Sequence, residues 1–144
     1  MRYTNRIFSL ISILICTSFT VSQWQTIQTP SSRNLFDLNI PAPSIVWALG
    51  PGDSSIVRTT NNGQTWILVN SPVTQLIHIA AVDQNTAWVC GGNPIGRIFK
   101  TTDGGSNWVE QTYSPASYIN NIYFFNANSG IFITDQVAGV YGFF

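Results

Sequence analysis

Three tryptophans recur at a constant interval along this chain, and that interval constrains the fold more than any other feature. Trp24, Trp66 and Trp108 lie 42 residues apart. The segment from Arg58 to Trp66 aligns without gaps with the segment from Lys100 to Trp108. A fixed period of roughly 20 to 50 residues is typical of architectures in which each copy forms one supersecondary unit. The sequence therefore predicts an array of similar units.

The repeat extends well beyond the tryptophans. Residues 35–50 align with residues 76–91 at an offset of 41, and residues 76–91 align with residues 119–134 at an offset of 43. Each unit reads as four short strands separated by turn-forming residues. In the second unit we expect these strands at residues 76–82, 87–90, 96–101 and 108–112. Four antiparallel strands in a unit of this length are typical of one blade of a β-propeller.

A turn motif precedes two of the tryptophans. A threonine, an aspartate or asparagine, and a glycine alternate with other residues, and the tryptophan follows. The short polar side chain can accept hydrogen bonds from the backbone of its own turn, and glycine can take a positive φ without steric cost. The motif residues are Thr59, Asn61, Gly63 and Trp66 in one copy and Thr101, Asp103, Gly105 and Trp108 in the other.

This motif resembles the Asp-box, also called the BNR repeat. The resemblance covers residues 23–144 and implies a β-propeller in which the eight motif residues are structural. Asp-box propellers include sialidases, some endoglucanases, sortilin-type receptors and photosystem II stability/assembly factor-like proteins. The run from Ile98 to Gly105 looks most like the last group. Asn61 in place of aspartate, and the absence of a third complete motif, depart from the family pattern.

The strand count predicts an all-β chain with about three blades. We expect one lone strand at residues 24–28, two full blades at residues 35–69 and 76–112, and three further strands in residues 119–143. Propellers usually have about four to eight blades. The sequence therefore predicts a partial propeller, interpreted as a fragment of a larger one, and association of copies into a larger ring is the alternative.

The first 22 residues have the pattern of a secretory signal peptide. Arg2 and Arg6 precede an uncharged apolar run, and small or tolerated residues stand before Gln23. The run of about 13 residues is shorter than the roughly 20 needed to span a bilayer, so a membrane anchor is the weaker interpretation. A lipoprotein signal at Cys16 is disfavoured by the large Ile15 before it. We expect a secreted or periplasmic chain of residues 23–144 with no membrane segment after cleavage.

The number and the positions of the charged residues argue against several function classes. Charged residues make up 8% of the chain, with six basic and six acidic residues. This low and balanced charge argues against a nucleic-acid-binding protein. A sialidase-like site would need several converging arginines, for which residues 23–144 contain Arg33, Arg58 and Arg97. Glu110, the single glutamate, falls on a predicted outermost strand. An endoglucanase-like pair of acids could come from Asp37, Asp53, Asp83 or Asp135, but no two of them are set apart by context.

Metal and cofactor sites are not expected. His78 is the single histidine, and it aligns with Asp37 and Asn121 in the neighbouring repeats, which favours a structural or surface role. One histidine and Cys90 do not make a zinc site. The glycine-rich loop at residues 91–97 lacks the lysine and hydroxyl residue of a phosphate-binding loop, and the turn at residues 103–105 lacks the ligand spacing of a calcium loop.

The predicted function is therefore a secreted, non-catalytic binding or scaffold module. Its partner would be a protein or a glycan, and copies could also associate through the open faces of the terminal blades. A fragment of a glycan-active hydrolase is the alternative. An inner surface lined by aromatic and amide side chains would favour binding, whereas a pair of acids there would favour hydrolysis.

Overall fold

We describe the protein from a computed structural model covering residues 24–32, 34–50, 55–91, 96–111 and 118–135. These residues form ten β-strands and no helix, so none of them lies in a helix long and apolar enough to cross a membrane. The strands are β1 (Asp37–Ala42), β2 (Ile45–Leu49), β3 (Ile56–Thr59), β4 (Ile67–Val69), β5 (Leu76–Ala81), β6 (Ala87–Gly91), β7 (Arg97–Thr101), β8 (Val109–Gln111), β9 (Ile119–Asn126) and β10 (Ser129–Thr134).

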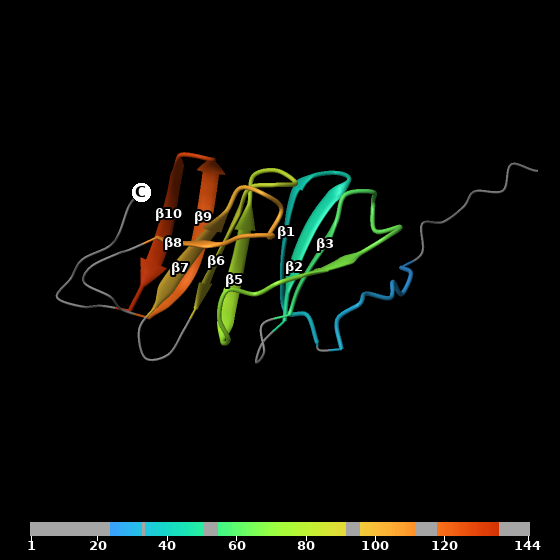
Figure 1. Cartoon of the computed structure of the whole chain (residues 1–144), viewed down its shortest axis with the longest axis horizontal. Helices are drawn as coiled ribbons and strands as arrows, with labels where there is room; N and C mark the ends of the chain where they lie inside the picture. The colour runs from blue at the N-terminus through green and yellow to red at the C-terminus, as the bar shows by residue number, and fades with distance from the viewer. Residues whose placement is uncertain (1–23, 33, 51–54, 92–95, 112–117, 136–144) are drawn as a thin grey trace, which may run out of the picture.

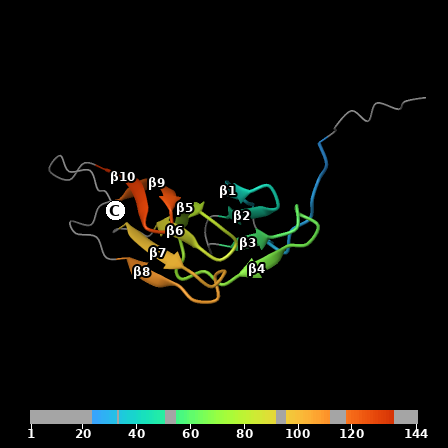
Figure 2. The same ribbon diagram turned by 90° about the horizontal axis from the view of Figure 1, so that it is seen from above.

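The strands form three antiparallel sheets that stand side by side (Figure 1). The first sheet has the order β1-β2-β3-β4, the second has the order β5-β6-β7-β8, and the third consists of β9 and β10. Seen from above, β1, β5 and β9, the first strand of each sheet, lie along one side, and β4 and β8 lie along the other (Figure 2). We call β1, β5 and β9 the inner strands and β4 and β8 the outer strands. This radial arrangement of consecutive sheets is that of a partial β-propeller. The predicted fold class is confirmed.

The strand positions in the second sheet agree with the predicted ones to within one or two residues at each end. The lone strand predicted at residues 24–28 is wrong: this segment forms no strand, and the Trp24 side chain is fully exposed. Trp24 matches the repeat spacing of a fourth strand. In the two full sheets the fourth strand pairs with the third strand of the same sheet, and the part of the chain that the structure describes has no such strand before Trp24. The third strand predicted for the last unit, the proposed signal peptide and Arg33 lie outside the described residues.

Two apolar cores hold the three sheets together, one between each pair of neighbours. The first lies between the first and second sheets and is built around Trp47, with Leu49, Ile56, Val89 and Phe99. The second lies between the second and third sheets and is built around Trp88, with Cys90, Ile98, Ile122 and Phe132. Trp47 and Trp88 are equivalent in the repeat, so the two cores are built on the same positions of successive units.

A cation also links each pair of neighbouring sheets at equivalent positions. The Arg58 guanidinium lies 5.1 Å from the ring centroid of Trp47 and donates to the carbonyl oxygen of Gln84, in the turn that follows β5. The Lys100 ammonium lies 4.9 Å from the ring centroid of Trp88 and donates over 2.8 Å to the carbonyl oxygen of Ala127, in the turn that follows β9. The aligned basic residues therefore join sheets, which argues against a convergent arginine site.

Candidate functional site

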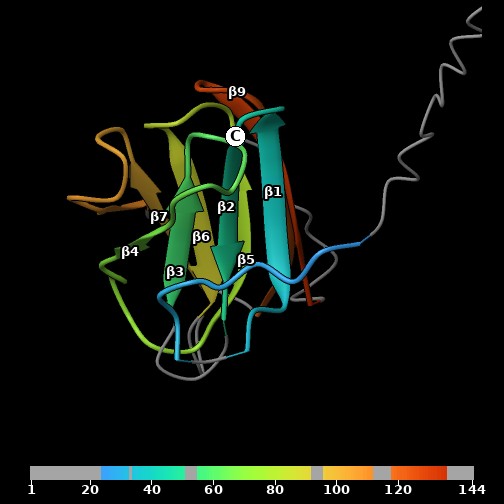
Figure 3. The same cartoon turned by 90° about the vertical axis from the view of Figure 1, so that its right-hand side faces the viewer.

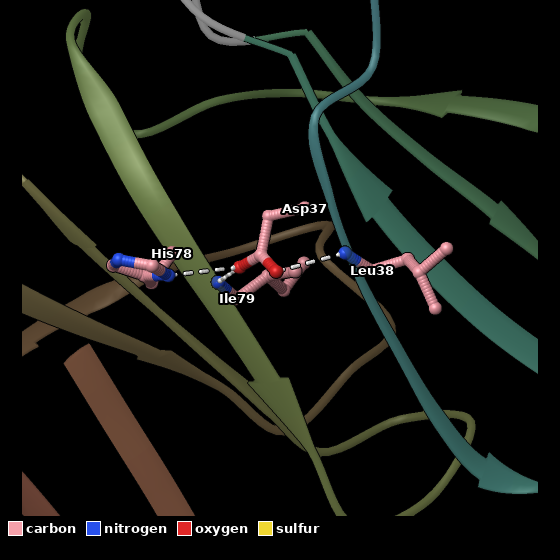
Figure 4. Close-up of polar contacts among 4 residues, drawn as sticks. All are labelled: Asp37, Leu38, His78 and Ile79. Atoms are coloured by element: carbon pink, nitrogen blue, oxygen red, sulfur yellow. Dashed lines mark hydrogen bonds and ion pairs between the residues drawn. The ribbon is translucent and has the colours of Figure 1, made fainter.

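Asp37 joins the inner strands of the first two sheets (Figure 4). Its Oδ2 accepts a hydrogen bond from the backbone N–H of Ile79 over 2.8 Å, and its Oδ1 accepts one from the N–H of Leu38 over 3.0 Å. The Nδ1 of His78 lies 3.3 Å from the same Oδ2. The carboxylate is thus occupied by backbone donors, and both aligned residues, Asp37 and His78, line the inner strands.

Asn39 repeats this bridge two residues further along β1. Its Oδ1 accepts a hydrogen bond from the N–H of Ala81 over 3.2 Å. In the next unit the position of Asn39 is occupied by Ala80, whose side chain has no acceptor. The polar bridge at Asn39 is therefore specific to the junction of the first two sheets.

A hollow of about 340 Å³ lies at the carboxyl ends of the three inner strands. Three of its side chains are more than half exposed: Ile40 at 57%, Tyr123 at 54% and Phe125 at 61%. The rings of Tyr123 and Phe125 meet edge to face with their centroids 5.2 Å apart. The surface combines apolar side chains with an amide, which suits contact with an extended polypeptide. Its lining residues are Asn39, Ile40, Pro41, Ala81, Val82, Tyr123, Phe124 and Phe125.

The predicted motif residues lie elsewhere, in the turns between β3 and β4 and between β7 and β8. In the second turn the Thr101 hydroxyl donates to the Asp103 Oδ1 over 2.8 Å and accepts from the Gly105 N–H over 2.9 Å. The same Oδ1 accepts from the Asn107 N–H over 2.9 Å. These bonds stabilise the turn itself, and no residue of the turn lines the hollow.

The first turn has the same hydrogen bonds with an amide in place of the carboxylate. The Thr59 hydroxyl donates to the Asn61 Oδ1 over 2.9 Å and accepts from the Gly63 N–H over 3.1 Å. The Asn61 Oδ1 accepts from the Thr65 N–H over 3.0 Å. Gly63 and Gly105 both have positive φ, at 78° and 88°. Asparagine therefore reproduces the geometry of the aspartate turn.

The two motif tryptophans are not equivalent. Their 42-residue spacing predicts equivalent buried sites between neighbouring sheets, because equal positions in a radial repeat bury equal faces, and this prediction is wrong. Both are half-buried. The indole N–H of Trp108 donates to the carbonyl oxygen of Asn70, beside the preceding sheet, over 2.8 Å, and its ring packs against the first core. The indole N–H of Trp66 donates to the carbonyl oxygen of Gly63 in its own turn over 3.1 Å. The two tryptophans differ because Trp108 has a preceding sheet to pack against, whereas no sheet precedes that of Trp66 in the part of the chain described.

Acid is expected to weaken the Asp103 turn. Hydrogen bonds from the backbone and side chain of Asn107, and from Thr101, lower the pKa of Asp103 from 3.8 to about 2. Because this pKa is depressed in the folded state, its stabilisation is present above pH 4 and is lost as pH falls from about 4 to about 2. Asp103→Asn, which copies Asn61, should flatten this part of the pH profile of thermal stability. An unchanged profile would contradict the role.

The carboxylates considered as catalytic candidates are engaged in local or structural hydrogen bonds where the structure describes them. Asp83 accepts from the N–H groups of Asn85 and Thr86. Glu110, on the outermost strand β8 as predicted, forms a two-pronged ion pair with Arg97. Asp135 accepts from the Asn120 amide. Asp53 lies outside the described residues.

The remaining reactive groups do not form a cluster. Burial raises the pKa of the Cys90 thiol to about 12, so it stays protonated in its core position. Within the described ranges, no three histidine, cysteine or acidic residues come together in a way that could hold a metal ion. The glycine-rich loop at residues 91–97 lies largely outside those ranges and connects β6 to β7.

The residues of the hollow were not predicted as a site from the sequence. Tyr123 and Phe125 lie one unit after Ala80 and Val82, and Asn39 lies one unit before Ala80. The signal that could have found them is the change of side chain at aligned inner-strand positions, where one repeat carries alanine and another carries an amide or an aromatic ring.

Comparison with known proteins gives structural matches only. No protein-family model and no curated protein matches the sequence. The fold is similar to the solved structure of YCF48 bound to D1 peptide, with a TM-score of 0.64 and 21% identity over 80% of this chain and 39% of that one. It is also similar to YCF48 from Cyanidioschyzon merolae, with a TM-score of 0.63 and 22% identity over 78% of this chain and 35% of that one. The chain thus spans less than two fifths of each of these two structures.

Proposed function

We propose that the chain is a non-catalytic binding module that holds an extended segment of a protein partner at its inner-strand surface. The observation that carries this proposal is the hollow shared by β1, β5 and β9, with Ile40, Tyr123 and Phe125 more than half exposed around it. Exposed aromatic side chains beside a concave surface are typical of binding sites. Among the described residues, no carboxylate, histidine or lysine lines the hollow, so its polar side chains, the Asn39 amide and the Tyr123 hydroxyl, supply hydrogen bonding.

The comparisons support a protein partner over the other candidates. One of the similar structures holds a D1 peptide, so a propeller of this kind can bind a polypeptide. The likeness of the run from Ile98 to Gly105 to photosystem II assembly factor-like proteins supports the same class. A glycan-active hydrolase fragment is the rival proposal, and it would need a catalytic pair of acids.

The test is selection from a library of short random peptides displayed on phage, followed by titration of a selected peptide. Phe125→Ser should weaken binding by roughly tenfold or more, because an aromatic contact residue is lost. Leu68→Ser is the matched control: Leu68 is 59% exposed on β4, away from the hollow, and its variant should bind normally. Failure to select any peptide, or equal binding by both variants, would contradict the proposal, and selective binding of an oligosaccharide would favour the rival.

We also propose that the two threonine-containing turns are Asp-box turns with a structural role, that the chain is a portion of a larger propeller of this type, and that residues 1–22 direct export. Support for the first is the shared hydrogen-bond pattern of Asn61 and Asp103. Support for the second is that the chain spans 39% and 35% of the two similar structures. Support for the third is the charged, apolar and small-residue pattern of residues 1–22. Amino-terminal sequencing of exported protein should start at or near Gln23, and a start at Met1 would contradict export with cleavage.

A further inference from the structure

The third sheet has an apolar face directed away from the rest of the protein. Tyr123 is 54% exposed and Ile133 is 52% exposed, and Ile131 lies half-buried between them on the same face. With Asn121 and Ile122 these side chains line a hollow of about 180 Å³. No charged residue lies among them.

The repeat identifies what normally covers such a face. Ile131 and Ile133 occupy the positions of Trp88 and Cys90 in the second sheet, at the same offset of 43 residues. Trp88 and Cys90 are 1% and 0% exposed because the third sheet covers them. The Trp88 ring stacks on Phe124 with the ring centroids 3.6 Å apart. In this fold, then, the face that carries Ile131 and Ile133 is the one on which a following sheet packs.

The first sheet presents the matching surface. Leu38 and Ile40 occupy the positions of Ile122 and Phe124, the side chains with which the third sheet covers the second. Leu38 is 59% exposed and Ile40 is 57% exposed. The segment of residues 24–32 crosses the same face (Figure 3), and the end of the Ile27 side chain lies beside Gly63, in the turn after β3. It leaves Leu38 and Ile40, on the inner strand, accessible.

We propose that two copies of this chain associate head to tail, so that the third sheet of each receives the first sheet of the other. The contact continues the interface that already joins the first sheet to the second and the second to the third. The three sheets that the structure describes in each chain give six in two copies, which is within the range of about four to eight blades at which propellers close. Two such contacts related by a twofold axis form a closed assembly.

The test is the mass of the full chain, measured by sedimentation equilibrium over a range of concentrations. The expected species has twice the mass of a single chain. Leu38→Lys and Ile133→Lys each place a charge in both contacts of a homodimer, so each variant should be a monomer. Val109→Lys is the matched control: Val109 is 65% exposed on β8, outside both faces, and its variant should remain a dimer.

Mixing the two monomeric variants tests the head-to-tail arrangement itself. In a mixed pair both lysines fall in one contact, and the other contact joins an unaltered first sheet to an unaltered third sheet. The mixture should therefore recover dimer that neither variant forms alone. Loss of dimer without recovery on mixing would overturn the arrangement, and so would a dimer that both substitutions leave intact.

Near-UV circular dichroism identifies a variant that fails to fold, in which case Leu38→Thr or Ile133→Thr replaces it. A wild-type chain that is monomeric at every concentration would overturn the proposal and assign the face to another partner or to another segment of the chain. Ile40 and Tyr123 border both the hollow of the proposed function and the faces of this contact. The inference still does not rest on the proposed function, because a monomer that binds selected peptides would contradict only the association, and a dimer that selects no peptide would contradict only the proposed function.

Discussion

Trp88→Ala is expected to lower the free energy of unfolding by about 3–5 kcal/mol, the usual cost of removing a large aromatic side chain from a core. Trp88 is 1% exposed, stacks on Phe124 of the third sheet and lies under the Lys100 ammonium. Its removal would leave a cavity between the second sheet and the two-stranded sheet of β9 and β10. Chemical denaturation followed by far-UV circular dichroism measures the loss.

Trp24→Ala is the control for this prediction. Trp24 matches the repeat spacing of the motif tryptophans, but its side chain is fully exposed and packs on nothing. Its replacement should leave the free energy of unfolding within about 0.5 kcal/mol of the wild type, as for other exposed sites. A large loss at Trp24, or a negligible one at Trp88, would contradict the assignment of the core.

Gly105→Ala is expected to be the second most damaging of these single substitutions. A Cβ on Gly105 would meet a side-chain carbon of the buried Val69, in the neighbouring sheet, at far less than contact distance. The positive φ of 88° costs an alanine about 1–2 kcal/mol. Overpacking against Val69 adds about 1–3 kcal/mol. The melting temperature should fall accordingly, with the fold otherwise retained.

Gly63→Ala separates these two causes, because Gly63 has a similar φ of 78° in the equivalent turn. A Cβ there would meet the end of the Ile27 side chain at 3.4 Å, close to an ordinary contact. Only the backbone cost of about 1–2 kcal/mol remains. Equal losses in the two variants would show that the Val69 collision is relieved without cost, contrary to our expectation.

Much of the fold could be predicted from the sequence because each unit repeats the same local signals. The aligned Trp47 and Trp88, and the aligned Arg58 and Lys100, take equivalent places because successive sheets pack in the same way. The prediction was wrong at Trp24 and at the pair Trp66 and Trp108, where the surroundings differ. The spacing of a residue fixes its place within a unit, whereas its burial depends on whether another sheet lies beside that unit.

The candidate site was harder to predict for the same reason. Asp37 and His78 have aligned positions, and the sequence favoured a structural or surface role for such a tolerant position. Their contact across two sheets depends on the angle between blades, which no local pattern encodes. Tyr123 and Phe125 are ordinary strand residues by composition, and they become a surface feature because they lie on the inner strand of the last sheet described.

Amide hydrogen exchange of the chain with and without a phage-selected peptide tests most directly whether the inner strands form the binding surface. Bound peptide is predicted to slow exchange in β1, β5 and β9, around Asn39, Ala81 and Tyr123, and to leave β4 and β8 unchanged. Protection confined to the outer strands and the turns at Asp103 and Asn61, or no protection at all, would contradict the proposal that this surface holds the partner.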